Sequence, residues 1–107
     1  MSTEVSTAEA TRTRNIRPAF QVREDERGVH LSVALPGVRR EDLKLTVREG
    51  VLDLEAPRAG TDTLYRLTSP LERRLDGDRI EARHENGVLE ALIPLREEAL
   101  PRSIPIS

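Results

Sequence analysis

Alternation of apolar and polar positions recurs in several short segments of this sequence and predicts β-strands. The clearest case covers residues 29–35, where every second residue is aliphatic: Val29, Leu31, Val33 and Leu35. A period of two places these side chains on one face of an extended strand, so this strand has one buried and one solvated face. Pro36-Gly37 follows and ends it.

Other segments show the same alternation. Leu43, Leu45 and Val47 mark a second strand, and Leu52 and Leu54 mark a third over residues 51–56. Only Glu49-Gly50 separates these two strands, so they are predicted to be antiparallel neighbours.

Two further strands are predicted from weaker patterns. A first, edge-like strand covers residues 16–22, and within it Pro18 is tolerable only where its missing N–H faces solvent. Another covers residues 64–68 and stops at Pro70. Residues 71–78 are predicted to form a loop, because the flanks of Asp76-Gly77 do not alternate.

Asn86-Gly87 is the strongest turn signal in the chain. A type I′ turn needs a positive φ angle at both central residues, and Asn-Gly satisfies this need best. Residues 80–85 alternate before the turn, and Leu89, Ala91 and Ile93 share one face after it. Pro94 then ends the second strand of the hairpin.

Regularly spaced short strands without an amphipathic helix predict an all-β fold, an antiparallel β-sandwich of about seven or eight strands. We expect one folded domain over residues 15–94. Residues 1–14 contain too few apolar side chains to offset the entropy of ordering, so they are predicted to form a disordered arm. Residues 95–107 are predicted to form a polar tether.

Composition excludes several classes of function. The net charge is −2 and the only aromatic residues are Phe20 and Tyr65, so neither a polyelectrolyte partner nor a base-stacking nucleic-acid surface is expected. No apolar run approaches the roughly 18 residues of a membrane span. The chain contains no cysteine, which fits a reducing compartment, and we expect a cytoplasmic protein.

The residue types of several catalytic sites are present, but not in the contexts that catalysis needs. Ser32, His84 and Asp53 include the residue types of a hydrolase triad, but neither His84 nor His30 lies in a nucleophile-elbow context. Two isolated histidines without spaced carboxylates or thiols do not predict a zinc site, and no Gly-rich phosphate loop is present. We therefore expect no catalytic residue, no metal and no cofactor, and a protein that is not an enzyme.

A combination of motifs in a fixed order resembles the α-crystallin domain of the small heat-shock proteins. The segments that carry the resemblance are Leu35-Pro36-Gly37-Val38, residues 41–45, Val51-Leu52, residues 80–82, Asn86-Gly87-Val88-Leu89 and Ile104-Pro105-Ile106. The resemblance implies an immunoglobulin-like sandwich, self-association through a dimer building block, and a stress-response chaperone that binds unfolding proteins without ATP.

The resemblance also gives a role to the tail anchor Ile104-Pro105-Ile106. It implies docking in a hydrophobic edge groove of a neighbouring subunit, formed by Leu43, Leu45 and Val47 on one side and by Ile80 and Ala82 on the other. Proline preorganises the tail, and burial of each isoleucine is worth roughly 1.5–3 kcal/mol. Association costs at least ~4 kcal/mol, so several contacts are needed for stable assembly. The tether reaches at most about 33–36 Å, which allows docking within one subunit or between subunits.

The expected dimer mode follows from a short loop. Many members of this family carry a long loop with an exchanged strand before the position of residues 64–68, whereas residues 57–63 are too few to exchange. The expectation is instead edge-to-edge pairing of one strand with its twofold mate, through Leu64, Tyr65, Arg66 and Leu67.

A second function stays open from the sequence. The same sandwich could serve as a structural or adaptor module that binds one defined partner. The absence of aromatic residues from positions 1–14 favours this alternative, whereas the tail anchor favours the chaperone.

Overall fold

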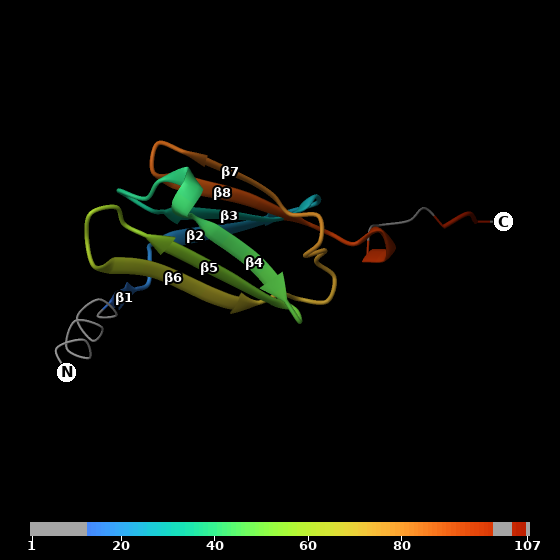
Figure 1. Ribbon diagram of the computed structural model, residues 1–107. Helices are drawn as coiled ribbons and strands as arrows, with labels where there is room; N and C mark the ends of the chain where they lie inside the picture. Colours follow the sequence, from blue (N-terminus) through green and yellow to red (C-terminus); the bar gives the residue numbers. More distant parts are fainter. Residues whose placement is uncertain (1–12, 100–103, 107) are drawn as a thin grey trace.

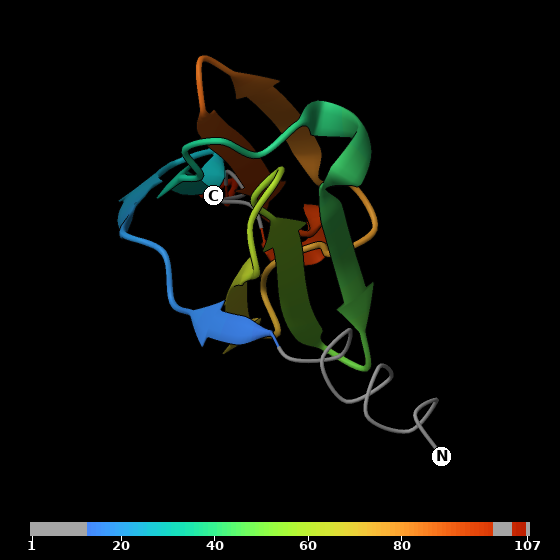
Figure 2. The same cartoon turned by 60° about the vertical axis from the view of Figure 1, so that its left-hand side comes forward.

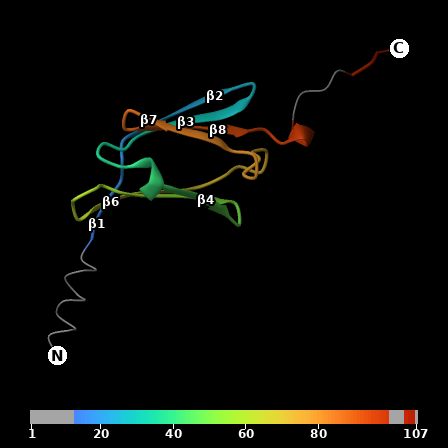
Figure 3. The same cartoon turned by 45° about the horizontal axis from the view of Figure 1, so that its top comes forward.

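The computed structural model describes residues 13–99 and 104–106, and within them the chain forms a sandwich of two four-stranded sheets (Figures 1 and 3). The first sheet has the order β1 (Arg14–Ile16), β6 (Thr63–Pro70), β5 (Val51–Pro57), β4 (Lys44–Arg48). The second has the order β2 (Phe20–Asp25), β3 (Gly28–Ala34), β8 (Val88–Pro94), β7 (Glu81–Glu85). Two short 3-10 turns complete the described chain: η1 (Arg40–Asp42) and η2 (Glu97–Ala99). The predicted all-β sandwich is confirmed.

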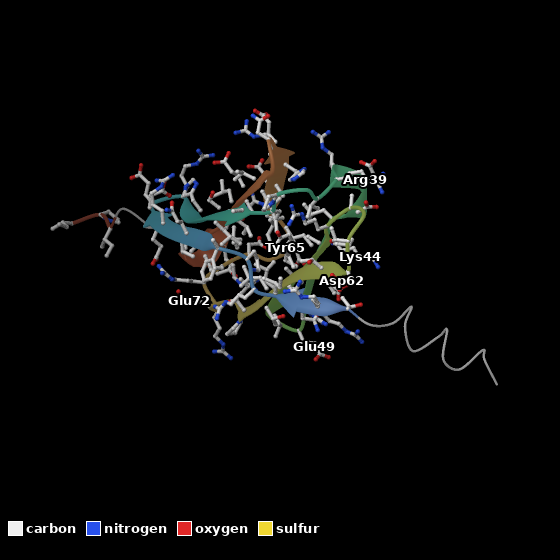
Figure 4. The ribbon with its side chains drawn as sticks, turned by 90° about the vertical axis from the view of Figure 1, so that its left-hand side faces the viewer. Arg39, Lys44, Glu49, Asp62, Tyr65 and Glu72 are labelled. Carbon is white, nitrogen blue, oxygen red and sulfur yellow. The ribbon has the colours of Figure 1, made fainter. Side chains whose placement is uncertain are left out.

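The core lies between the sheets and is built from the alternating positions. Its buried strand residues are Leu31 and Val33 of β3, Leu52, Leu54 and Ala56 of β5, Tyr65 and Leu67 of β6, and Leu89, Ala91 and Ile93 of β8. Tyr65 lies near the middle of the molecule, whereas Glu49 lies at its rim (Figure 4). Period-two patterning therefore assigns the inward face of these strands correctly.

Two hairpins turn through residues with positive φ. Asn86 and Gly87 connect β7 to β8 with φ values of 52° and 75°. Glu49 and Gly50 connect β4 to β5 with the same pair of values. Both connections therefore have the handedness of type I′ turns, which matches the twist of the strands they join. The first turn also contacts the residue that follows β3, because the Leu35 N–H donates to the Gly87 carbonyl oxygen at 2.7 Å.

The prediction of one continuous strand over residues 16–22 is wrong, because the structure divides this segment between the two sheets. β1 ends at Ile16, the chain crosses through the buried Pro18, and β2 begins at Phe20 (Figure 2). Proline cannot donate to a ladder, which explains why neither strand includes it. β1 pairs in parallel with β6, from Arg14 opposite Thr63 to Ile16 opposite Tyr65, so the first sheet is mixed rather than purely antiparallel.

The loop over residues 71–78 contains a core residue that the pattern did not reveal. The segment has no strand, as predicted, but Leu75 is buried and forms an isolated bridge with Leu95. The Asp76 N–H donates to the Pro94 carbonyl oxygen at 2.7 Å, which holds the loop against the end of β8. The loop thereby closes one end of the sandwich.

The described residues contain neither a membrane-spanning helix nor a cluster of metal ligands. No helix there has the length and apolar character needed to cross a membrane. No group of three or more acidic or histidine side chains in the same residues could hold a metal ion.

Candidate functional site: a groove between two sheet edges

An open groove lies on the side of the sandwich where β4 ends one sheet and β7 ends the other. In Figure 2, β7, η1 and β4 follow one another along this side, and β2 lies on the opposite side. The groove has a volume of about 380 Å³, and its lining residues are Arg40, Leu43, Leu45, Ala82, Arg83, His84 and Leu89.

Strand register explains the apolar surface of this groove. Ala82 pairs with Ala91, and His84 pairs with Leu89, so their side chains share the inward face of the second sheet. β7 is the last strand of that sheet, and Ala82 is therefore exposed although it faces the interior. Leu43 and Leu45 face it from the other sheet and are only partly buried.

The structure brings together part of the residue set predicted for the docking groove. Leu43, Leu45 and Ala82 line it. Val47 and Ile80 are partly buried against the core and lie outside the lining. Four lining residues were not predicted: Arg40, Arg83, His84 and Leu89. His84 is two residues from Ala82 on the same strand, so the alternation of side chains could have placed it on the groove face. No pattern in the sequence singles out Arg40.

The edge of β7 offers backbone groups to the groove. Because the Asn86-Gly87 turn has two residues, Glu85 and Val88 form the closing hydrogen-bonded pair of the ladder. The backbone groups of Ala82 and His84 consequently point away from β8. Arg40 occupies one of them, since its Nη2 donates to the His84 carbonyl oxygen at 3.2 Å.

His84 also carries an unusual polar atom. Its Nε2 is buried and has no hydrogen-bond partner among the described residues. A buried polar atom without a partner costs about 1–3 kcal/mol, and the penalty is removed when a bound group supplies the missing bond.

Arg83 contributes little positive charge to the groove, because its side chain lies on the opposite face of β7. There its Nη2 donates to Glu90 Oε2 at 3.0 Å. This hydrogen bond, together with the charges of Glu85 and Glu90, raises the pKa of Arg83.

The described tail residues do not fill the groove of their own domain. Ile104 is 81% exposed and Ile106 is 94% exposed, and both lie beyond the end of the sandwich (Figure 1). Two large aliphatic side chains are therefore in solvent on the same molecule that carries an open apolar groove.

The predicted dimer edge lies on β6, where β1 already occupies part of it. β1 pairs with Thr63, Leu64 and Tyr65, so the outer edge of β6 is open only beyond these residues. Tyr65 and Leu67 point into the core, and Arg66 is exposed. Pairing of two copies through this edge stays a prediction.

Comparison with known proteins identifies the family. The model of the Hsp20/alpha crystallin family matches residues 21–107, and the chain belongs to this family. It is 36% identical over 85 residues to 18 kDa antigen 2 of Mycobacterium avium, covering 68% of this chain and 62% of the relative. It is 31% identical over 107 residues to the 23.5 kDa mitochondrial heat shock protein of Arabidopsis thaliana, covering 89% of this chain and 51% of the relative.

Solved structures share the fold. Heat shock protein 16.0 from Schizosaccharomyces pombe superposes with a TM-score of 0.70 at 21% identity, covering all of this chain and 94% of that one. A small heat-shock protein from Xylella fastidiosa also has a TM-score of 0.70, at 22% identity, covering 86% of this chain and 97% of the other.

Proposed function

We propose that this small heat-shock protein is an ATP-independent chaperone that holds unfolding proteins and prevents their aggregation. The observation that carries the proposal is the open groove between β4 and β7 on a molecule whose tail isoleucines are exposed. An unfolding protein exposes extended apolar segments, and a groove with an apolar floor and a free strand edge can bind such a segment.

In the resting protein, we propose that the groove binds the Ile104-Pro105-Ile106 tail of a neighbouring copy. Proline holds the tail extended, so little entropy is lost on docking. The isoleucine side chains would cover Leu43, Leu45 and Leu89, while the tail backbone pairs with the groups of Ala82 and His84 at the edge of β7. A tail carbonyl oxygen would also provide a partner for His84 Nε2.

The energies favour exchange over permanent closure. Burial of two isoleucine side chains contributes about 3–6 kcal/mol, and association costs at least ~4 kcal/mol. A single docked tail is therefore weak, and an assembly is stable only when several tails dock together. Departure of one tail uncovers a groove, which is how apolar surface becomes available to a client without ATP.

The test compares the wild type with the double variant Ile104→Ala/Ile106→Ala. We expect the wild type to suppress the aggregation of a heated client equally with and without ATP, and the double variant to form smaller assemblies in native mass spectrometry. Val51→Ala, which truncates an exposed aliphatic residue on β5, is the matched control. No suppression at molar excess of the wild type contradicts the chaperone function, and unchanged assembly of the double variant contradicts tail docking.

A second candidate is an adaptor that binds one defined partner through the same groove. One observation favours it: of the two aromatic residues in the chain, Tyr65 is buried, so a client meets only Phe20. Aromatic side chains supply much of the energy of apolar binding surfaces. An adaptor would leave the aggregation of unrelated clients unchanged, which the same assay measures. Cytoplasmic location stays a prediction, because the similar proteins include a mitochondrial one.

A further inference from the structure

β2 is an edge strand that is exposed along its whole length. All six of its residues are exposed, and it ends the second sheet on the side opposite the groove (Figure 2). Phe20 and Val22 are large apolar residues on this strand, with 39% and 57% of their surfaces exposed. A long edge with apolar side chains readily pairs with another strand.

The hydrogen-bonding groups at this edge follow from the β2–β3 hairpin. Asp25 pairs with Gly28 across a two-residue connection, and the Ala34 N–H donates to the Ala19 carbonyl oxygen at 2.9 Å. The odd-numbered residues of β2 therefore bond to β3. The backbone groups of Phe20, Val22 and Glu24 point away from the sheet, and no described strand pairs with them.

We propose that β2 pairs antiparallel with β2 of a second copy, with the twofold axis at Val22. In this register Val22 lies opposite Val22 of the second copy, and Phe20 lies opposite its Glu24. Phe20, Val22 and Glu24, whose backbone groups point away from β3, then each donate one and accept one backbone hydrogen bond across the interface. Opposite residues also share a face, as a twofold axis perpendicular to the sheet requires.

Neighbouring registers are less favourable. A shift of one residue turns the second copy over, so that the inward face of one sheet continues as the outward face of the other. A shift of two in one direction places Arg23 opposite its own copy, and like charges directly opposite each other are destabilising. A shift of two in the other direction places Glu24 opposite Pro18, which has no N–H to donate. The register centred on Val22 avoids all three problems.

The apolar side chains support the same arrangement. Phe20 and Val22 pair with Val33 and Leu31, so they lie on the inward face of the sheet. A second copy would extend this face with its own Val22 and Phe20, giving a continuous apolar strip across the interface. Arg17 already covers one face of the Phe20 ring, with its guanidinium carbon 5.2 Å from the ring centroid.

This interface differs from pairing through β6 and is independent of tail docking. β1 occupies the β6 edge at Leu64 and Tyr65, whereas no described strand occupies β2. Because β2 and the groove lie on opposite sides of the sandwich, a dimer formed through β2 leaves both grooves open.

Because the chain contains no cysteine, single substitutions test the register directly. The test uses the Ile104→Ala/Ile106→Ala background, so that tail docking cannot hold copies together. We expect Val22→Cys to form a disulfide-linked dimer under mild oxidation, since hydrogen-bonded antiparallel pairs have Cα atoms about 5.5 Å apart, within the range for a disulfide. Phe20→Cys and Glu24→Cys should form the corresponding dimer only when the two variants are mixed.

Two further variants complete the test. Arg66→Cys reports pairing through β6 and should form no disulfide-linked dimer. Val22→Lys places two like charges at the axis and should convert the dimer to a monomer in native mass spectrometry, with circular dichroism confirming that it is folded. The proposal is overturned if Val22→Cys forms no disulfide-linked dimer, if Arg66→Cys is the variant that cross-links, or if folded Val22→Lys remains a dimer.

Discussion

The guanidinium of Arg40 donates from Nη2 to the backbone carbonyl oxygen of His84 at 3.2 Å, and so joins η1 to the edge of β7 across the rim of the groove. A segment that pairs with β7 must compete for this carbonyl oxygen. An exposed hydrogen bond contributes about 0.5–1.5 kcal/mol. We therefore expect Arg40→Ala to tighten the binding of an Ile-Pro-Ile peptide by up to about tenfold, measured by isothermal titration calorimetry.

The neighbouring arginine provides the control for this experiment. Arg39 pairs with Asp42 at 3.0 Å and does not line the groove, so Arg39→Ala should leave the peptide affinity unchanged. Weaker binding by Arg40→Ala would show instead that the guanidinium holds the peptide, and would contradict competition for the His84 carbonyl.

The two type I′ turns predict opposite effects of reciprocal substitutions. Glu49 has φ of 52°, a conformation that costs an ordinary residue roughly 1–2 kcal/mol and an asparagine less. We expect Glu49→Asn to raise the free energy of unfolding by about 1 kcal/mol and Asn86→Glu to lower it by a similar amount. Urea denaturation measures both variants, and a stabilising Asn86→Glu would refute the assignment of turn strain.

Asp25 should make stability depend on pH in the acid range. Its Oδ1 accepts the N–H of Arg27 at 2.9 Å and its Oδ2 lies 2.8 Å from His30 Nε2. The Arg27 hydrogen bond, aided by His30, lowers the pKa of Asp25 from its ordinary value of 3.8. A lowered folded-state pKa gives stability that is present above the unfolded value and is lost as the pH falls through the folded one.

Thermal melts of Asp25→Asn check this expectation. The variant should melt below the wild type at pH 7, and the gap should shrink as the pH falls below 3.8. Glu26→Gln, in the same turn, is the matched control. A gap that is equally large at about pH 2.5 would show that the ionised carboxylate is not its cause.

Alternation and turn chemistry predict most of this fold from sequence. The spacing of apolar residues correctly places four side chains in the core: Leu31, Val33, Leu52 and Leu54. When one face of a strand is buried, alternate residues must all lie on that face, so the pattern allows only one orientation of the strand. Pro18 and Leu75 were the difficult positions. Three residues of β1 are too few to show a period, and burial of Leu75 depends on a bridge to Leu95, which is distant in sequence.

The candidate site was predictable only in its apolar half. Leu43, Leu45 and Ala82 belong to segments in which apolar and polar residues alternate, and resemblance to the family placed these segments beside one another. Arg40 reaches His84 across 44 positions of sequence, and such a contact depends on how η1 is held between the sheets. A polar contact of this kind has no local sequence signal.

The walls of the groove belong to different layers of the sandwich, Leu43 and Leu45 to one and Ala82 and His84 to the other. Its width is therefore the spacing between the layers, which the buried side chains maintain. A segment docked there clamps the layers together, so docking and resistance to heat are thermodynamically linked.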